Sequence, residues 1–122
     1  MRTDQFAPYL LSLMRAVFGF LFLFHGLQKL FGMFGRDSVA LVSLPGLAGA
    51  IEVVAGLMIV LGWKTRPAAF LASGEMAVAY FMVHQPNGVW PIQNNGELSA
   101  LYCFAFLYLS ARGGGPISLD RR

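Results

Sequence analysis

The stretch FLFLFHGLQKLFG, residues 20–32, decides the fold class of this chain. It begins as an unbroken apolar run of the kind that faces lipid, and then introduces His25, Gln28 and Lys29 within five residues. A hydrophobic helix that ends in ionisable groups is typical of a membrane span whose polar stripe faces protein rather than lipid.

The composition excludes an ordinary soluble domain. Of 122 residues, 57% are hydrophobic and only 12% are charged, and the mean hydropathy is +0.60. These values indicate an all-α polytopic membrane protein. The net charge of +3 is spread singly between apolar runs, so no nucleic-acid partner is predicted. The lone Cys103 excludes an internal disulfide, a CxxC redox pair and an all-cysteine metal site.

Four apolar segments predict a bundle of four transmembrane helices within a single domain, residues 1–122. A bilayer core of about 30 Å needs roughly 20 residues of helix. The predicted helices cover residues 8–31, 46–62, 67–83 and 97–111. The connection GWKTRP, residues 62–67, contains two cations and a proline, so we expect the second and third helices to form a tight antiparallel hairpin.

The distribution of Lys and Arg near the helix ends predicts the orientation. Because basic residues concentrate in cytoplasmic loops, both termini are expected in the cytoplasm. One face carries Arg2, Lys64, Arg66, Arg112, Arg121 and Arg122, and the other carries Lys29 and Arg36.

Several ionisable residues fall inside the predicted spans, where each costs about 2.5–3.5 kcal/mol unless it faces protein and is paired. Counting along the helices places Arg15 and Glu75 at similar depths, roughly 10–12 Å from the cytoplasmic face. We therefore expect Arg15 and Glu75 to form an ion pair. Its simplest role is structural, because a buried pair fixes helix order and register.

A second group of ionisable residues, the outer polar tier, is predicted near the opposite face. Its members are His25, Lys29, Glu52 and Glu97. Steps of three and four residues put His25 and Lys29 on the same stripe of the first helix as Arg15. A titratable histidine, a lysine and two carboxylates are typical of a ligand site. The alternative is that Lys29 and Glu97 extend to the headgroup region without binding anything.

Five short motifs occur in an order and spacing that resembles the DoxX family of small four-helix bacterial membrane proteins. They are HGLQKLFG (25–32), GAIEVVAGLMIVLGWKTRPAA (49–69), HQPNG (84–88), NNGELS (94–99) and GPISLD (115–120). The resemblance implies a multi-pass protein of the bacterial inner membrane. It also implies a membrane component of a quinone-linked or thiol- and sulfur-related redox assembly. No catalytic residue and no metal site is assigned.

Three functions remain open at this stage. The first is a membrane subunit that binds a quinone head group, with His25 and Lys29 donating to a quinone carbonyl and Glu52 or Glu97 moving the proton. No intrinsic cofactor pattern is present, so a partner protein would supply the electrons. The second is a non-enzymatic anchoring or assembly protein that binds a protein partner or a second copy. The third is a proton-coupled transporter, because small multidrug transporters are also four-helix chains of similar length with a Glu inside the membrane. It is less favoured, because those transporters carry that Glu in the first helix, where this chain has Arg15.

Overall fold

The computed structural model describes residues 3–35 and 37–120, and every regular element in this part of the chain is helical. Arg2, Arg36, Arg121 and Arg122, which enter the charge count, lie outside the described residues. The principal helices are α1 (Ala7–Phe31), α2 (Leu44–Leu61), α3 (Thr65–Ala79) and α5 (Glu97–Arg112). The connections contain short helices: η1 (Asp4–Phe6), η2 (Met33–Gly35), η3 (Tyr80–His84), η4 (Gln85–Asn87) and α4 (Pro91–Asn94).

The principal helices begin and end close to the predicted positions. Their ends differ from the predicted ranges by two residues or fewer, except that α3 stops at Ala79 and continues as the π-helix η3. Local signals explain the boundaries. Pro8 lies in the first turn of α1, and Ser43 caps α2 by accepting from the Gly46 backbone N–H at 3.0 Å. Gly62 ends α2 at φ +68°, where a side chain would meet Ser118 and Arg15.

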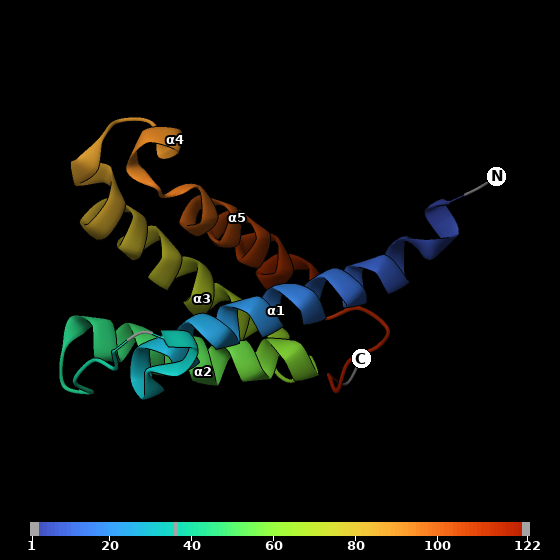
Figure 1. The fold of residues 1–122 in the computed structure, drawn as a ribbon. Coiled ribbons are helices and arrows are strands. Elements are labelled where there is room, and N and C mark those ends of the chain that lie inside the picture. The colour runs from blue at the N-terminus through green and yellow to red at the C-terminus, as the bar shows by residue number, and fades with distance from the viewer. Residues whose placement is uncertain (1–2, 36, 121–122) are drawn as a thin grey trace.

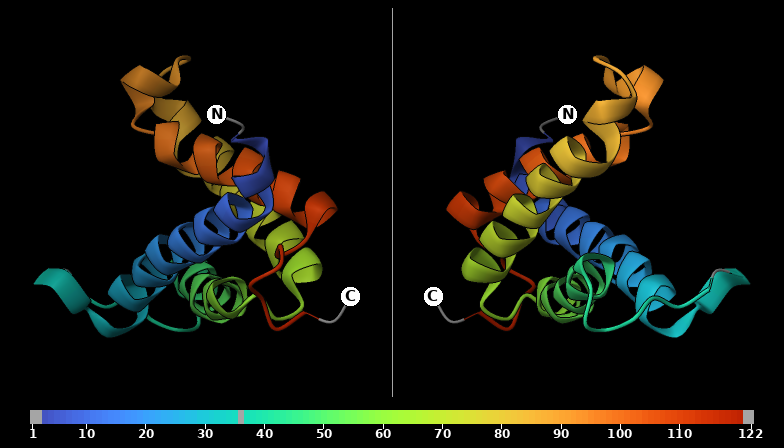
Figure 2. Two further views of the ribbon diagram at one scale, coloured as in Figure 1. Left: turned by 90° about the vertical axis from the view of Figure 1, so that its right-hand side faces the viewer. Right: turned by 90° about the vertical axis from the view of Figure 1, so that its left-hand side faces the viewer.

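The helices form two pairs that cross (Figure 1). The most extensive contacts join α1 to α2 and α3 to α5, and a smaller contact joins α2 to α3. Figure 2 shows that the pairs meet near the α2–α3 turn and diverge toward the two long connections. The core at the crossing contains large side chains from all four helices together with small residues of α3. They are Phe22, Ala55, Ile59, Ala68, Ala69, Ala72, Met76, Tyr102, Phe106 and Leu109.

Glycine permits the close approach of α1 to α2. A Cβ atom built at Gly26 would lie 2.7 Å from the carbonyl oxygen of Gly49 and 2.7 Å from the backbone nitrogen of Val53. These are backbone atoms, which cannot rotate away. On α2, Gly49, Glu52 and Gly56 share one stripe and are all buried.

The outer surface is that of a membrane protein. Two helical stretches, Asp4–Phe31 and Leu44–Leu61, are long and apolar enough to cross a bilayer. Large apolar side chains are exposed on all four principal helices, as expected where lipid rather than water covers the surface. Examples are Leu13, Phe20, Val54, Leu57, Phe70, Val78, Leu101 and Phe104.

Candidate functional site

A buried ion pair between α1 and α2 forms the centre of the candidate site. The Lys29 Nζ donates to Oε2 of Glu52 at 2.7 Å. The Glu52 side chain is fully buried, whereas the Lys29 side chain is 32% exposed. Lys29 therefore connects a carboxylate inside the protein with the surface of the bundle. Both residues belong to the predicted outer polar tier, and the structure brings them into direct contact.

Glu75 of α3 belongs to the same group of charges. It interacts electrostatically with Glu52 and Lys29. Its Oε1 and the Oε1 of Glu52 are both buried without a hydrogen-bond partner among the described residues. Two carboxyl groups and one ammonium carry no net charge when one carboxyl group holds a proton, and that neutral state suits a hydrocarbon environment. The group can thus hold an exchangeable proton.

Aromatic residues close one side of this group. Tyr102 of α5 is almost completely buried and lies within electrostatic range of Glu52. Its ring packs edge-to-face with the His25 imidazole, with centroids 6.1 Å apart, and with Phe22 at 5.5 Å. We call Lys29, Glu52 and Glu75, with His25 and Tyr102 beside them, the polar cluster. Members come from all four principal helices.

Glu97 lies away from the polar cluster. It begins α5, is exposed, and lines a shallow apolar groove with Pro91, Leu101 and Phe104. No hydrogen bond or ion pair joins it to Lys29 or Glu52 in the described part of the chain. The divergence of the helix pairs explains this, because Lys29 and Glu97 lie near the separated ends of α1 and α5 (Figure 2). Equal depth in the membrane therefore does not bring these residues together.

The structure also does not bring Arg15 and Glu75 together, so the predicted ion pair is wrong. Arg15 is buried, and its guanidinium donates to three carbonyl oxygens, those of Gly114, Val60 at 3.3 Å and Ile117 at 2.8 Å. The carboxylate with which it interacts electrostatically is Asp120. The prediction considered only depth in the membrane and left out the C-terminal segment, residues 113–120. This segment runs back beside α1 (Figure 1) and supplies Gly114, Ile117 and Asp120, whereas Val60 belongs to α2.

Two members of the polar cluster were not predicted from the sequence to lie in this site. Glu75 was assigned to Arg15, and Tyr102 was not singled out. A signal for Glu75 was present, because Ala68, Ala72 and Glu75 share a stripe of small residues on one face of α3. Such a stripe marks a helix that approaches others closely, and α3 contacts both α5 and α2, the helix that carries Glu52. No comparable signal distinguishes Tyr102 from the other aromatic residues of α5.

The connection between α3 and α5 is ordered by a buried asparagine. Asn94 donates to the carbonyl oxygen of Gly88 at 3.0 Å and to the Tyr80 hydroxyl at 3.2 Å. Its side-chain oxygen accepts from the Gly96 backbone N–H at 2.8 Å. These bonds tie the π-helix to the start of α5, and π-helical turns are frequent at functional sites. The motifs HQPNG and NNGELS therefore share a structural role.

A helical membrane protein with a charged, protonatable cluster between its helices is the class that this fold and site define. The DoxX family profile matches residues 10–85. An uncharacterized protein of Haemophilus influenzae is 37% identical over an alignment of 126 residues, which covers 98% of this chain and 94% of that protein. The inner membrane protein YphA of Escherichia coli is 32% identical over an alignment of 127 residues, which covers 94% of this chain and 91% of that protein. No solved structure matches.

The match over more than half of the chain, together with these near full-length relatives, shows that the chain belongs to the DoxX family of membrane proteins.

Proposed function

We propose that this chain is a membrane subunit of a quinone-linked oxidoreductase assembly, in which the polar cluster receives a quinone head group. The observation that carries this proposal is the group formed by Lys29, Glu52 and Glu75. In it one ammonium lies near two carboxyl groups, and one oxygen of each carboxyl group has no hydrogen-bond partner in the described part of the chain. A partner protein supplies the electrons. A quinone bound here takes up the two electrons and two protons, and the protons pass one after the other through the Glu75 carboxyl group, which is reprotonated from the surface of the bundle beside Lys29.

The residues of the cluster fit such a head group in distinct roles. Lys29 is partly exposed and can donate a hydrogen bond to a carbonyl oxygen while Glu52 holds its ammonium in place. Glu75, whose Oε1 lacks a partner, holds the proton to be exchanged. Glu52 is fully buried and hence a positioning residue. Glu97, an expected member of the site, has no part in this proposal.

Replacing Glu75 with Gln tests this role. The change keeps the size of the side chain and a donor for the side-chain hydrogen bond to Glu52, and it removes the exchangeable proton. We expect the purified native assembly to lose co-purifying quinone and quinone-dependent turnover at least tenfold, with little change in thermal stability. The matched control Glu97→Gln removes a carboxylate outside the cluster and should retain both.

The same measurement decides between this proposal and an anchoring or assembly role. If Glu75→Gln is as stable as the parent and retains quinone and turnover, the cluster only connects the helices. If Glu75→Gln and Glu97→Gln both lose quinone, the loss does not come from the cluster. Quantifying quinone and partner subunits by mass spectrometry in the same samples separates loss of ligand from loss of assembly.

We further propose that all four principal helices span the inner membrane and that both termini face the cytoplasm. Three observations support this. The YphA relative is described as an inner membrane protein, all four helices expose apolar side chains, and the fold gathers Lys64, Arg66 and Arg112 at one end of the bundle. Lys29 lies toward the other end of α1, so the charge bias is consistent with positive residues inside.

Cysteine labelling in intact cells tests this orientation without altering any charge. In a Cys103→Ser background, we expect Val89→Cys to react with an impermeant maleimide and Leu119→Cys to be protected until the cells are opened. Both positions are exposed, Val89 at 72% and Leu119 at 62%. The opposite pattern would invert the orientation, and labelling of both sites would contradict the proposal that α5 crosses the membrane.

A further inference from the structure

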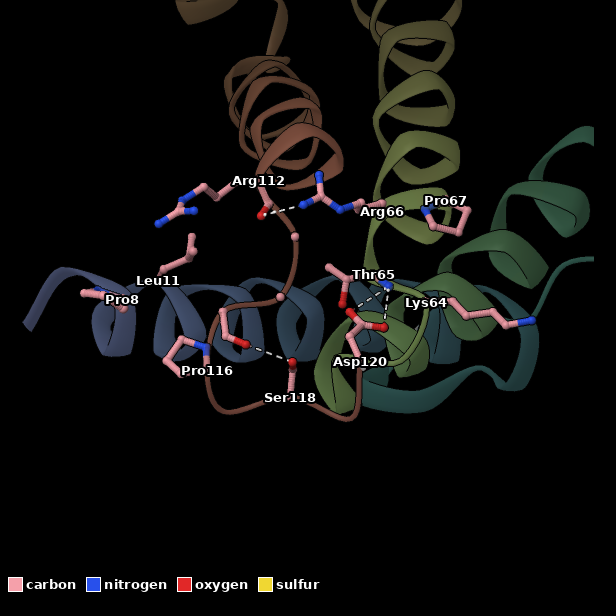
Figure 3. Close-up of a pocket in the computed structure, with 13 residues that line it drawn as sticks. Pro8, Leu11, Lys64, Thr65, Arg66, Pro67, Arg112, Pro116, Ser118 and Asp120 are labelled. Atoms are coloured by element: carbon pink, nitrogen blue, oxygen red, sulfur yellow. Dashed lines mark hydrogen bonds between the residues drawn. The ribbon is translucent and has the colours of Figure 1, made fainter. Parts of the chain in front are cut away.

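A second polar region lies at the opposite end of the bundle, far along α1 from Lys29. A cavity of about 580 Å³ opens where the start of α1, the α2–α3 turn and the C-terminal segment meet (Figure 3). Its charged lining residues are Lys64, Arg66, Arg112 and Asp120. Three cations and one carboxylate leave a formal charge of +2 around the cavity. The cavity therefore favours an anion.

None of these three cations forms an ion pair with a described carboxylate, and two of them also make no side-chain hydrogen bond in the described part of the chain. Arg66 is engaged, because its guanidinium donates to the carbonyl oxygens of Ala111 and Arg112 and so fixes the end of α5. The Arg112 side chain has no such hydrogen bond in the described part of the chain. Lys64 is exposed and lies 5.0 Å from the centroid of the Trp63 ring. Arg112 and Lys64 are thus available to a ligand.

A buried hydroxyl in the cavity wall also lacks a partner. Thr65 begins α3, is 0% exposed and lines the cavity, and its Oγ1 has no hydrogen-bond partner among the described residues. Its backbone N–H donates to the Asp120 carboxylate, at 3.2 Å and 3.4 Å. Figure 3 shows the Thr65 side chain beside Asp120 within the ring of lining residues. A buried hydroxyl seldom remains unpaired unless a ligand or water meets it.

The other wall of the cavity is apolar and continuous with the surface that faces lipid. Pro8 and Leu11 of α1 line it, and the neighbouring Tyr9, Leu10 and Leu13 are exposed by 55–59%. Figure 3 shows Arg112 above this side of the cavity. A ligand held here meets cations and a hydroxyl on one side and hydrocarbon on the other. That combination fits an amphiphile with a phosphate group better than a soluble anion.

We propose that this cavity binds the phosphate group of an anionic phospholipid from the adjacent leaflet, with Arg112 as the principal contact and Lys64 and Thr65 Oγ1 as additional donors. Arginine suits phosphate because its guanidinium presents a fixed fork of donors. Basic pockets at the ends of transmembrane helices are known to take such headgroups. The site does not include the polar cluster, so it stands independently of the proposed quinone function.

Native mass spectrometry of the full chain, released from nanodiscs containing equal amounts of phosphatidylglycerol and phosphatidylcholine, tests the site. We expect the parent to retain phosphatidylglycerol selectively and Arg112→Gln to retain about tenfold less, as for the loss of one charge-assisted hydrogen bond. Arg36→Gln removes the same charge from the connection that follows the opposite end of α1 in the sequence, and it should retain as much as the parent. Thr65→Val, which keeps the backbone N–H, should lower retention severalfold.

The remaining outcomes either correct the occupant or overturn the site. If inorganic phosphate displaces the lipid at equal concentration, the phosphate chemistry is right but the occupant is a soluble anion. Equal losses in Arg112→Gln and Arg36→Gln would show a general charge effect and overturn the proposal. Absence of any preference for phosphatidylglycerol in the parent would also overturn it. Thermal melts of all variants verify folding, and Arg112→Gln should melt like the parent because its side chain holds no hydrogen bond.

Discussion

Replacing Lys29 with Met should lower the free energy of unfolding by about 3–5 kcal/mol, because it leaves the fully buried Glu52 without its ammonium partner. Glu52→Met should cost less, since Lys29 is 32% exposed and lies near Glu75 as well. The double variant Lys29→Met/Glu52→Met should recover much of the loss, because neither charge then remains buried. Equilibrium unfolding in detergent measures the cycle.

The control for this cycle is Glu97→Gln, a carboxylate that is exposed at the start of α5 and makes no bond to the cluster. It should leave the unfolding free energy unchanged within a few tenths of a kcal/mol, as for surface substitutions generally. If the losses in the two single variants add up in the double variant, Lys29 and Glu52 do not depend on one another, and the ion pair is not the centre of the site.

Gly26→Ala should destabilise the protein by about 3 kcal/mol, at the upper end of the cost of overpacking, because the new methyl group would meet backbone atoms of α2. The Cβ would lie 2.7 Å from the Gly49 carbonyl oxygen and 2.7 Å from the Val53 nitrogen. To relieve these contacts, α1 and α2 must separate. Separation also lengthens the distance between Lys29 and Glu52, so quinone retention should fall together with stability.

Gly74→Ala supplies the matched control for this substitution. Gly74 is an exposed glycine within α3, and a Cβ built there meets no heavy atom within 4 Å. Alanine has a higher helix propensity than glycine, by up to about 1 kcal/mol, so this variant should be as stable as the parent or slightly more stable. Equal melting temperatures for Gly26→Ala and Gly74→Ala would show that α1 and α2 tolerate a wider spacing.

The sequence by itself determined where the helices lie and which residues are too polar to face lipid. Helix positions follow from local properties, namely the length of apolar runs, Pro8 at a start and Gly62 at an end. The burial of Glu52 and Arg15 follows from the high cost of exposing an ionisable group to hydrocarbon. The Lys29–Glu52 contact could also be predicted from the sequence. The helices α1 and α2 are consecutive, and the two residues lie at similar depths on the sides of these helices that face each other.

The tertiary structure decided which polar group each buried residue meets, because that depends on crossing angles and on segments outside the spans. Glu97 is separated from Lys29 since the two helix pairs diverge, and no sequence pattern encodes that angle. Arg15 bonds to carbonyl oxygens of residues 114 and 117 since the C-terminal segment folds back along α1. Glu75 therefore interacts with Glu52 and Lys29, and the polar cluster combines residues of the predicted outer polar tier with a carboxyl group that was predicted to pair with Arg15.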